Sequence, residues 1–318
     1  MTSFDMAVAG GGVIGLGVAL EAARRGARVV LVSDDGPRAS AAAAGMLCPS
    51  FEALHFGGRA LLKLGTDSLA LWDGFAASLA EDPARDLDYR RDGVIALGFP
   101  PRALPGEPCT VPDGVEASRA LLVPGEGQVD PRRLLPALER ACEAAGMERR
   151  AGRVSGLVGD AEQAQGVVLE GGESLRAATV VLATGAAPRE EAEMVPLRGR
   201  ALAVAGLPVM PERTLRSPGV YLCPKADGTL YVGATEEERD MPAALDGVWH
   251  EASWLMPSLT KGRIVRRFDG VRPGTRDGLP IVRRSSRKKA LILALGHHRN
   301  GVLLAPLTAK RVADLAGF

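Results

Sequence analysis

The sequence lacks several features that would assign it to a class of protein at once. Aromatic residues make up only 4% of the 318 residues, and there are four cysteines and four histidines. The cysteines have neither metal nor redox spacing, and the histidines are too dispersed for a zinc site. We therefore predict reduced thiols, no metal and a cytoplasmic location.

Excess charge and long apolar runs are also lacking. The net charge is +1, and the basic residues of 283–289 form only one short run, which we interpret as a solvated loop rather than a nucleic-acid surface. The uncharged stretch 6–20 follows Asp5, has no basic region before it and is interrupted by glycines, unlike a signal peptide. No run approaches the roughly 20 apolar residues of a membrane helix. We predict neither nucleic acid nor a membrane as partner.

What the N-terminal stretch does contain is the order strand, glycine turn, helix, strand. Residues 6–9 are apolar, which suits a strand buried on both faces. A helical pattern over 13–25 ends at Gly26, the favoured residue after a last turn. Residues 27–32 are again apolar. This order predicts a βαβ unit with a parallel sheet.

The turn of this unit reads GGGVIG and fits the pattern G-x-G-x-x-G. Gly10 permits the tight turn, Gly12 lets the backbone approach a pyrophosphate, and Gly15 lets the helix pack on the strand. Val13 and Ile14 open the helix, whose positive end faces the phosphates. The pattern predicts dinucleotide binding and does not by itself distinguish FAD from NAD.

The residue that binds the ribose departs from this pattern. An acidic side chain normally ends the second strand, where this sequence has Ser33 followed by Asp34. Either Asp34 reaches the ribose with a shifted backbone, or Ser33 makes a weaker bond. A third interpretation is that Asp34 and Asp35 merely form a turn.

Farther along, the pattern changes several times. Residues 60–79 predict a helix, whereas 92–123 contain short strands and many prolines, typical of a second domain. Asp130 and Pro131 suit the cap and first position of another helix. Further elements are predicted in the second half of the chain: strands at 153–158, 166–169, 178–182 and 290–295, and helices at 243–255 and 302–315.

Six segments, taken together, resemble the D-amino acid oxidase-like flavoproteins. Ser40–Leu47 resembles their S-x-x-x-A-G-M-L motif, and the two C-terminal segments are close to the glycine oxidases of thiamine biosynthesis. The segments occur in the family's order over nearly all of the chain. They are RASAAAAGML (38–47), GQVDPRRLLPAL (127–138), VVLATGA (180–186), VYLCPKADGTLYVGATEE (220–237), GVRPGTRDGLPIV (270–282) and GHHRNGVLLAPLTA (296–309).

This resemblance implies an α/β fold with a Rossmann-like FAD-binding domain and an interleaved α+β substrate domain built on an antiparallel sheet. The FAD-binding domain is expected over 1–80, 129–195 and 270–318, and the substrate domain over 81–128 and 196–269. The FAD is expected to be non-covalent, because no cysteine matches a position of covalent attachment. By analogy the chain forms a homo-oligomer, with a tetramer as the expected state.

The resemblance also implies roles for single residues. Arg272 would bind the substrate carboxylate through its planar fork, Tyr221 would add its hydroxyl, and Arg299 would stand beside the substrate. Met46 would form the pocket wall near the flavin. The backbone of 297–303 would face the pyrimidine end of the ring. The expected cofactor-binding residues are Gly10, Gly12, Val13, Ile14, Gly15, Ser33, Asp34, Ser40, Ala44, Gly45, Met46, Val154, His297, His298, Arg299, Asn300, Gly301, Val302 and Leu303.

The implied reaction is oxidative deamination of a small amino acid, with glycine the best candidate, to an oxo acid, ammonia and hydrogen peroxide. The sequence departs from the family at three places: Glu236 replaces an apolar residue, His298 replaces an aromatic one, and a tryptophan and a serine are missing near Ala186 and Ala187. A sarcosine oxidase, or an oxidase or dehydrogenase of D-amino acids, is the alternative. A flavin-binding subunit without turnover is a second alternative.

Overall fold

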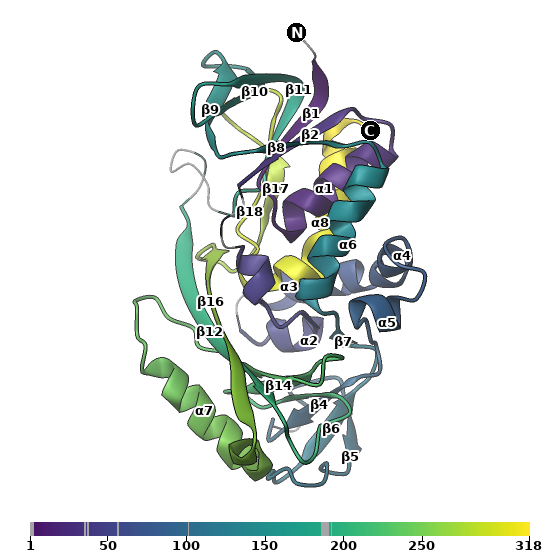
Figure 1. Ribbon diagram of the computed structural model, residues 1–318, viewed down its shortest axis with the longest axis vertical. Helices are drawn as coiled ribbons and strands as arrows, with labels where there is room; N and C mark the ends of the chain where they lie inside the picture. Colours follow the sequence, from purple (N-terminus) through teal and green to yellow (C-terminus); the bar gives the residue numbers. More distant parts are fainter. Residues whose placement is uncertain are drawn as a thin grey trace.

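The computed structural model describes residues 3–34, 36, 38–55, 57–100, 102–185, 191 and 193–318. Two large sheets lie toward opposite ends of an elongated molecule, with helices packed on each (Figure 1). None of the helices within these ranges is long and apolar enough to cross a membrane. The predicted homo-oligomer and cytoplasmic location stay predictions.

The first sheet is built around parallel strands that come from the N-terminus, the middle and the C-terminus of the chain. β1 pairs in parallel with β2 and β11, and β18 pairs in parallel with β11. The sheet order is β17 (Ile281–Arg284), β18 (Leu291–Leu295), β11 (Ser174–Leu182), β1 (Phe4–Ala9), β2 (Val29–Ser33) and β8 (Glu148–Ala151), with β9 (Val154–Gly159) and β10 (Ala164–Leu169) joined to β11.

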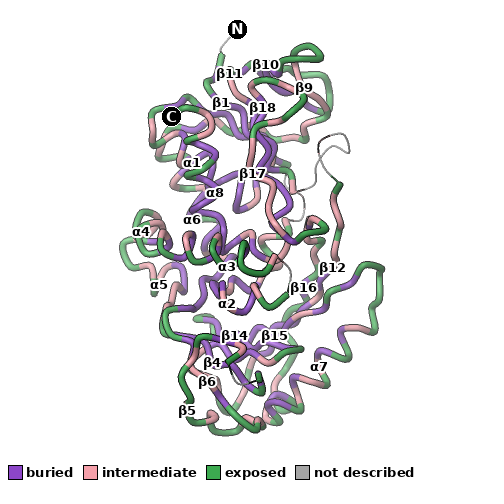
Figure 2. Tube along the Cα trace, turned by 180° about the vertical axis from the view of Figure 1, so that it is seen from behind, coloured by how far each residue is buried: buried purple, intermediate pink, exposed green. Residues whose placement is uncertain are grey.

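Both faces of this sheet are covered, which explains the uninterrupted apolar runs of its strands. Met6 and Val8 pack toward the helices α1 (Val13–Arg24), α6 (Pro131–Ala144) and α8 (Gly301–Ala316). Ala7 and Ala9 pack on the other face with residues of β10. Figure 2 shows the buried segments running along β1, β18 and α8.

The second sheet is largely antiparallel and carries one long helix, α7 (Ala244–Leu255). Its order is β16 (Arg263–Gly274), β12 (Val195–Ala205), β15 (Leu230–Gly233), β14 (Tyr221–Pro224), β13 (Thr214–Arg216), β4 (Val94–Leu97), β6 (Ala120–Val123) and β5 (Glu107–Cys109). β16 continues across the domain boundary predicted at 269/270, so Arg272 stands on the second sheet.

Shorter elements connect the two sheets. β3 (Met46–Leu47) pairs with β7 (Gly127–Gln128) between them. The remaining elements are α2 (Pro49–Glu52), α3 (Gly58–Leu69), α4 (Trp72–Ala77), α5 (Pro83–Leu87) and the short 3-10 turns η1 (Ala39–Ala42), η2 (Pro257–Lys261) and η3 (His298–Asn300).

Local signals in the sequence mark some of the helix ends. α6 begins as predicted, with Asp130 accepting a hydrogen bond from the Arg132 amide and Pro131 in the first position. The single helix predicted over 60–79 is wrong, because α3 and α4 are separate. The second of these helices is anchored by Trp72, which is fully buried and whose indole N–H donates to the Leu303 carbonyl at 2.9 Å. A tertiary contact of this kind leaves no periodic pattern in the sequence, so the separation of α3 and α4 could not be predicted.

Candidate active site

A cavity of about 1540 Å³ extends from the first sheet to the second. One end lies at the carboxyl ends of β1, β2 and β11, lined by Gly10, Ser33 and Ala183. The other end reaches Tyr221 on β14 and Arg272 on β16. The carboxyl edge of a parallel sheet is the usual place for a nucleotide, and the second sheet closes the far end.

The glycine turn between β1 and α1 includes glycines that the packing of the protein itself requires, Gly10 and Gly15 among them. A Cβ on Gly15 would lie 1.8 Å from the Gly10 carbonyl oxygen, and one on Gly10, which has φ +112°, would lie 2.4 Å from that of Ala183. Gly12 differs, because its Cβ would meet only the Ser40 hydroxyl oxygen, at 3.4 Å. The missing side chain of Gly12 therefore leaves room in the cavity, as close approach of a pyrophosphate requires.

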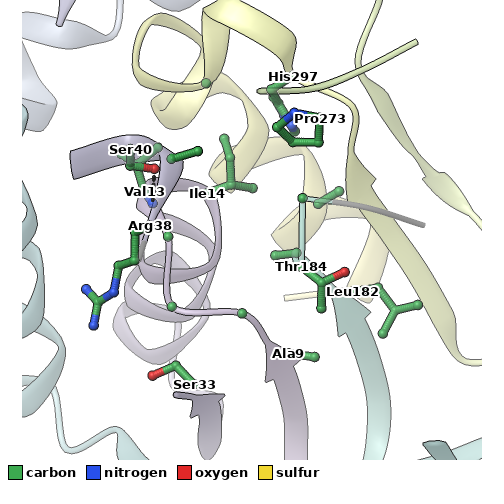
Figure 3. A pocket seen from close by; sticks show the side chains of 18 of the residues that line it. Ala9, Val13, Ile14, Ser33, Arg38, Ser40, Leu182, Thr184, Pro273 and His297 are labelled. Atoms are coloured by element: carbon green, nitrogen blue, oxygen red, sulfur yellow. Dashed lines mark hydrogen bonds between the residues drawn. The ribbon is translucent and has the colours of Figure 1, made fainter. Parts of the chain in front are cut away.

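The N-terminus of α1 faces this space. The Ser40 hydroxyl accepts a hydrogen bond from the Val13 amide at 3.2 Å, drawn as the dashed line in Figure 3. In the same view Ala9 and Ser33 lie at the ends of neighbouring strands below the turn. The helix dipole and its first amides thus point into the cavity beside a hydroxyl, an environment suited to phosphate oxygens.

The two residues considered for the ribose have different surroundings. Ser33 is buried, and its hydroxyl has no hydrogen-bond partner among the described residues. Asp34 also lines the cavity, but its carboxylate lies 3.1 Å from the Arg153 guanidinium and its side chain is 47% exposed. A buried hydroxyl without a partner favours Ser33 as the group that meets a ligand.

The start of α8 forms another wall of the cavity. His297 shares a hydrogen bond with the Thr308 hydroxyl at 3.0 Å, and burial lowers the pKa of His297 to about 3. Burial likewise lowers the pKa of His298 to about 4. Both rings are therefore neutral at pH 7. Asn300, at the N-terminus of α8, has a buried Oδ1 without a partner among the described residues.

Arg272 is held at the substrate end by backbone rather than by acidic groups. Its Nη1 donates to the Thr235 carbonyl at 3.1 Å and more weakly to that of Arg198 at 3.4 Å. The guanidinium lies over Gly199 on β12, where an added Cβ would stand 2.2 Å from it. Its charge is thus available to a carboxylate that enters the cavity.

Tyr221 lies on the neighbouring part of the second sheet. The residue is 9% exposed, and its ring stacks on that of Tyr231 with centroids 6.1 Å apart. The Tyr231 hydroxyl donates to the Ala42 carbonyl at 2.6 Å and so ties the sheet to the segment before Met46. Burial raises the pKa of Tyr221, so its hydroxyl keeps its proton and can donate.

Arg299 belongs to a buried charge network that the sequence did not reveal. Its Nε lies 3.0 Å from Glu52 and its Nη1 donates to Glu236 at 3.0 Å. Glu52 also accepts from Arg216 at 2.7 Å. Burial raises the pKa of Glu52, but the charges of Arg299 and Arg216 outweigh burial and lower it to about 2. Glu52 and Arg216 are far apart in sequence, and neither lies in a recognisable motif.

The cavity brings together the sequence-predicted site residues, apart from Gly15 and Leu303. Gly15 packs against the Gly10 carbonyl and does not line the cavity. Leu303 is a core residue whose carbonyl accepts hydrogen bonds from Ser68 and Trp72. The expected departures at Ala186 and Ala187 lie outside the described residues. The open space at Gly12 and the unpartnered polar atoms of Ser33 and Asn300 fit a bound dinucleotide, which these residues would hold.

Comparisons with known proteins agree with this geometry. The model of the FAD dependent oxidoreductase family (DAO) matches residues 5–315. Glycine oxidase of Geobacillus kaustophilus (strain HTA426) is 31% identical over 98% of this chain and 92% of its own length. The bifunctional protein ThiO/ThiG of Nostoc sp. (strain PCC 7120) is 32% identical over 98% of this chain, which spans 52% of that protein. The crystal structure of the Geobacillus kaustophilus glycine oxidase aligns with a TM-score of 0.86 at 29% identity, covering 99% of this chain and 95% of that one.

Proposed function

Because the chain belongs to the FAD dependent oxidoreductase family, we propose that it oxidises glycine with oxygen and water to glyoxylate, ammonia and hydrogen peroxide. The observation that carries this proposal is the pairing of two features in one cavity. A glycine turn suited to a dinucleotide lies at one end, and Arg272 and Tyr221 lie at the other. Relatives that match nearly the whole chain bear the name glycine oxidase.

In this proposal, side chains of the second sheet bind the substrate. Arg272 holds the substrate carboxylate through charge-assisted hydrogen bonds, and the protonated Tyr221 hydroxyl donates to the same group. The neutral rings of His297 and His298 add no positive charge beside the substrate amine. The N-terminus of α8 supplies a positive dipole end to the cavity. Bound FAD supplies the electron acceptor, which oxygen regenerates.

We further propose that this reaction feeds the synthesis of the thiazole part of thiamine. Support comes from the bifunctional ThiO/ThiG proteins, in which about half of the length matches nearly all of this chain. A strain that lacks the protein should then need added thiazole or thiamine to grow, and the intact gene should remove that need. Growth of the deletion strain without either supplement contradicts this role.

The activity is tested on the purified holoprotein in the absence of oxygen. Glycine should bleach the flavin absorbance, and admission of air should restore it with one hydrogen peroxide per glyoxylate. Sarcosine, D-alanine and D-proline are compared by kcat/KM under the same conditions. A protein that takes up no flavin, or whose flavin is not reduced by glycine, contradicts the proposal.

The carboxylate clamp is tested with Arg272→Ala. Losing a charge-assisted clamp should weaken apparent glycine binding by roughly 2–4 kcal/mol. Arg153→Ala is the matched control, because that guanidinium pairs with Asp34 at the opposite end of the cavity. Unchanged glycine kinetics in Arg272→Ala would remove this residue from the proposed role.

A further inference from the structure

The two arginines at the substrate end of the cavity differ in how their charges are used. Arg272 donates to two backbone carbonyls, and no carboxylate among the described residues is within ion-pair distance of it. Arg299 instead contacts two carboxylates, those of Glu52 and Glu236, each at 3.0 Å. At the substrate end of the cavity, the charge of Arg272 is therefore not matched by an acid among the described residues, whereas that of Arg299 is.

The two acids on Arg299 are held in different ways. Glu52 is 7% exposed at its side chain and bridges Arg299 to Arg216, so a ligand cannot easily displace it. The side chain of Glu236 is 30% exposed and forms an ion pair with Arg299. Glu236 is therefore the more exposed of the two acids on the Arg299 guanidinium.

Resting on the proposed function, we propose that Glu236 limits the enzyme to amines that carry a single carboxylate. Such a substrate uses Arg272. A second carboxylate on the amine substituent would need Arg299, and there it would meet the like charge of Glu236. Like charges at close range discriminate strongly between ligands of similar shape.

The charge of Glu236 is tested with two ligands that differ by one carboxylate, methoxyacetate and oxydiacetate. Both have an ether oxygen in place of the amine, so their binding is measured without turnover, as a change in the flavin spectrum of the holoenzyme. The wild type should bind methoxyacetate at least about tenfold more tightly than oxydiacetate. Glu236→Gln should tighten oxydiacetate binding by about tenfold and change methoxyacetate binding by less than about twofold.

Glu238→Gln is the matched control, because it removes one exposed carboxylate from the same segment. It should keep the wild-type ratio of the two affinities. Glu236→Met, which removes the charge with a different shape, should shift the ratio in the same direction as Glu236→Gln. The kcat/KM of iminodiacetate relative to sarcosine should rise in both Glu236 variants.

Three results would overturn this assignment. They are equal affinities in the wild type, an equal effect of Glu236→Gln on both ligands, and weakened methoxyacetate binding with oxydiacetate unchanged. The last result would show that Glu236 instead holds the cationic side of the substrate. If the enzyme oxidises glycine but lacks the predicted ratio of methoxyacetate to oxydiacetate affinity, only the role of Glu236 is overturned. If it shows that ratio but does not oxidise glycine, only the proposed function is overturned.

Discussion

Replacing Glu52 by glutamine removes the only carboxylate that the structure places between Arg216 and Arg299 in the described residues. The substitution keeps the shape of the side chain and leaves two buried guanidiniums with one less partner. The side chains of Glu52 and Arg216 are 7% and 3% exposed. Water therefore cannot replace the lost charge, and we expect a large loss of stability.

The size of this loss can be worked out in two ways. Breaking a buried ion pair by removing one partner costs about 3–5 kcal/mol. Lowering the pKa of Glu52 from its ordinary 4.5 to about 2 corresponds to about 3 kcal/mol. For a chain of this size a loss of about 3 kcal/mol should lower Tm by about 4–5 °C.

The assay is thermal unfolding of the holoprotein at a fixed, saturating concentration of FAD, followed by circular dichroism. Asp67→Asn is the control, because the Lys63–Asp67 pair on α3 has side chains 77% and 37% exposed. That variant should lose less than about 1 kcal/mol.

The pH dependence follows from the direction of the pKa shift. A carboxyl whose pKa is lowered by folding stabilises the folded state fully above its unfolded pKa. That contribution is lost as the pH falls from about 4.5 toward about 2. The difference between wild type and Glu52→Gln should therefore be constant from pH 8 to pH 5 and shrink below that. A Tm within 2 °C of the wild type at pH 7, measured under the same conditions, would refute this account.

Three further predictions concern the first sheet. Gly15→Ala should abolish stable flavin binding, seen as colourless purified protein, because the new Cβ would lie 1.8 Å from the Gly10 carbonyl. Asp34→Asn should leave the Kd for FAD within about twofold, whereas Ser33→Ala should raise it about fivefold, by fluorescence titration of the apoprotein. Asp130→Ala removes the cap of α6 and should cost about 1 kcal/mol, measured as a Tm lower by about 1–2 °C.

The first sheet could be predicted because its signals are local. Gly10, Gly12 and Gly15 form a pattern within six residues, and Gly26, with φ +91°, follows the end of α1 as the sequence predicts. The cap at Asp130 is equally local. Propensity and turn chemistry act over such distances, so they can be recognised in one sequence.

The charge network could not be predicted, because its members meet only through the tertiary fold. Glu52 and Arg216 are separated by 164 positions in the chain. A single glutamate in a short helical turn is normally solvated, so Glu52 gives no signal of burial. Arg272 was found through the resemblance of its segment to a flavoprotein family. Its contacts with the backbone of β12, by contrast, depend on strand pairing that local patterns do not encode.

Gly199 shows that a residue without a side chain can affect how tightly a ligand is bound. The flat end of Arg272 rests on the bare Cα of this residue, and even one methyl group there would occupy the same space. Evolutionary selection for the affinity of the substrate carboxylate should therefore act on Gly199 of β12 as well as on Arg272. A search for altered specificity that samples only cavity-facing side chains would overlook it.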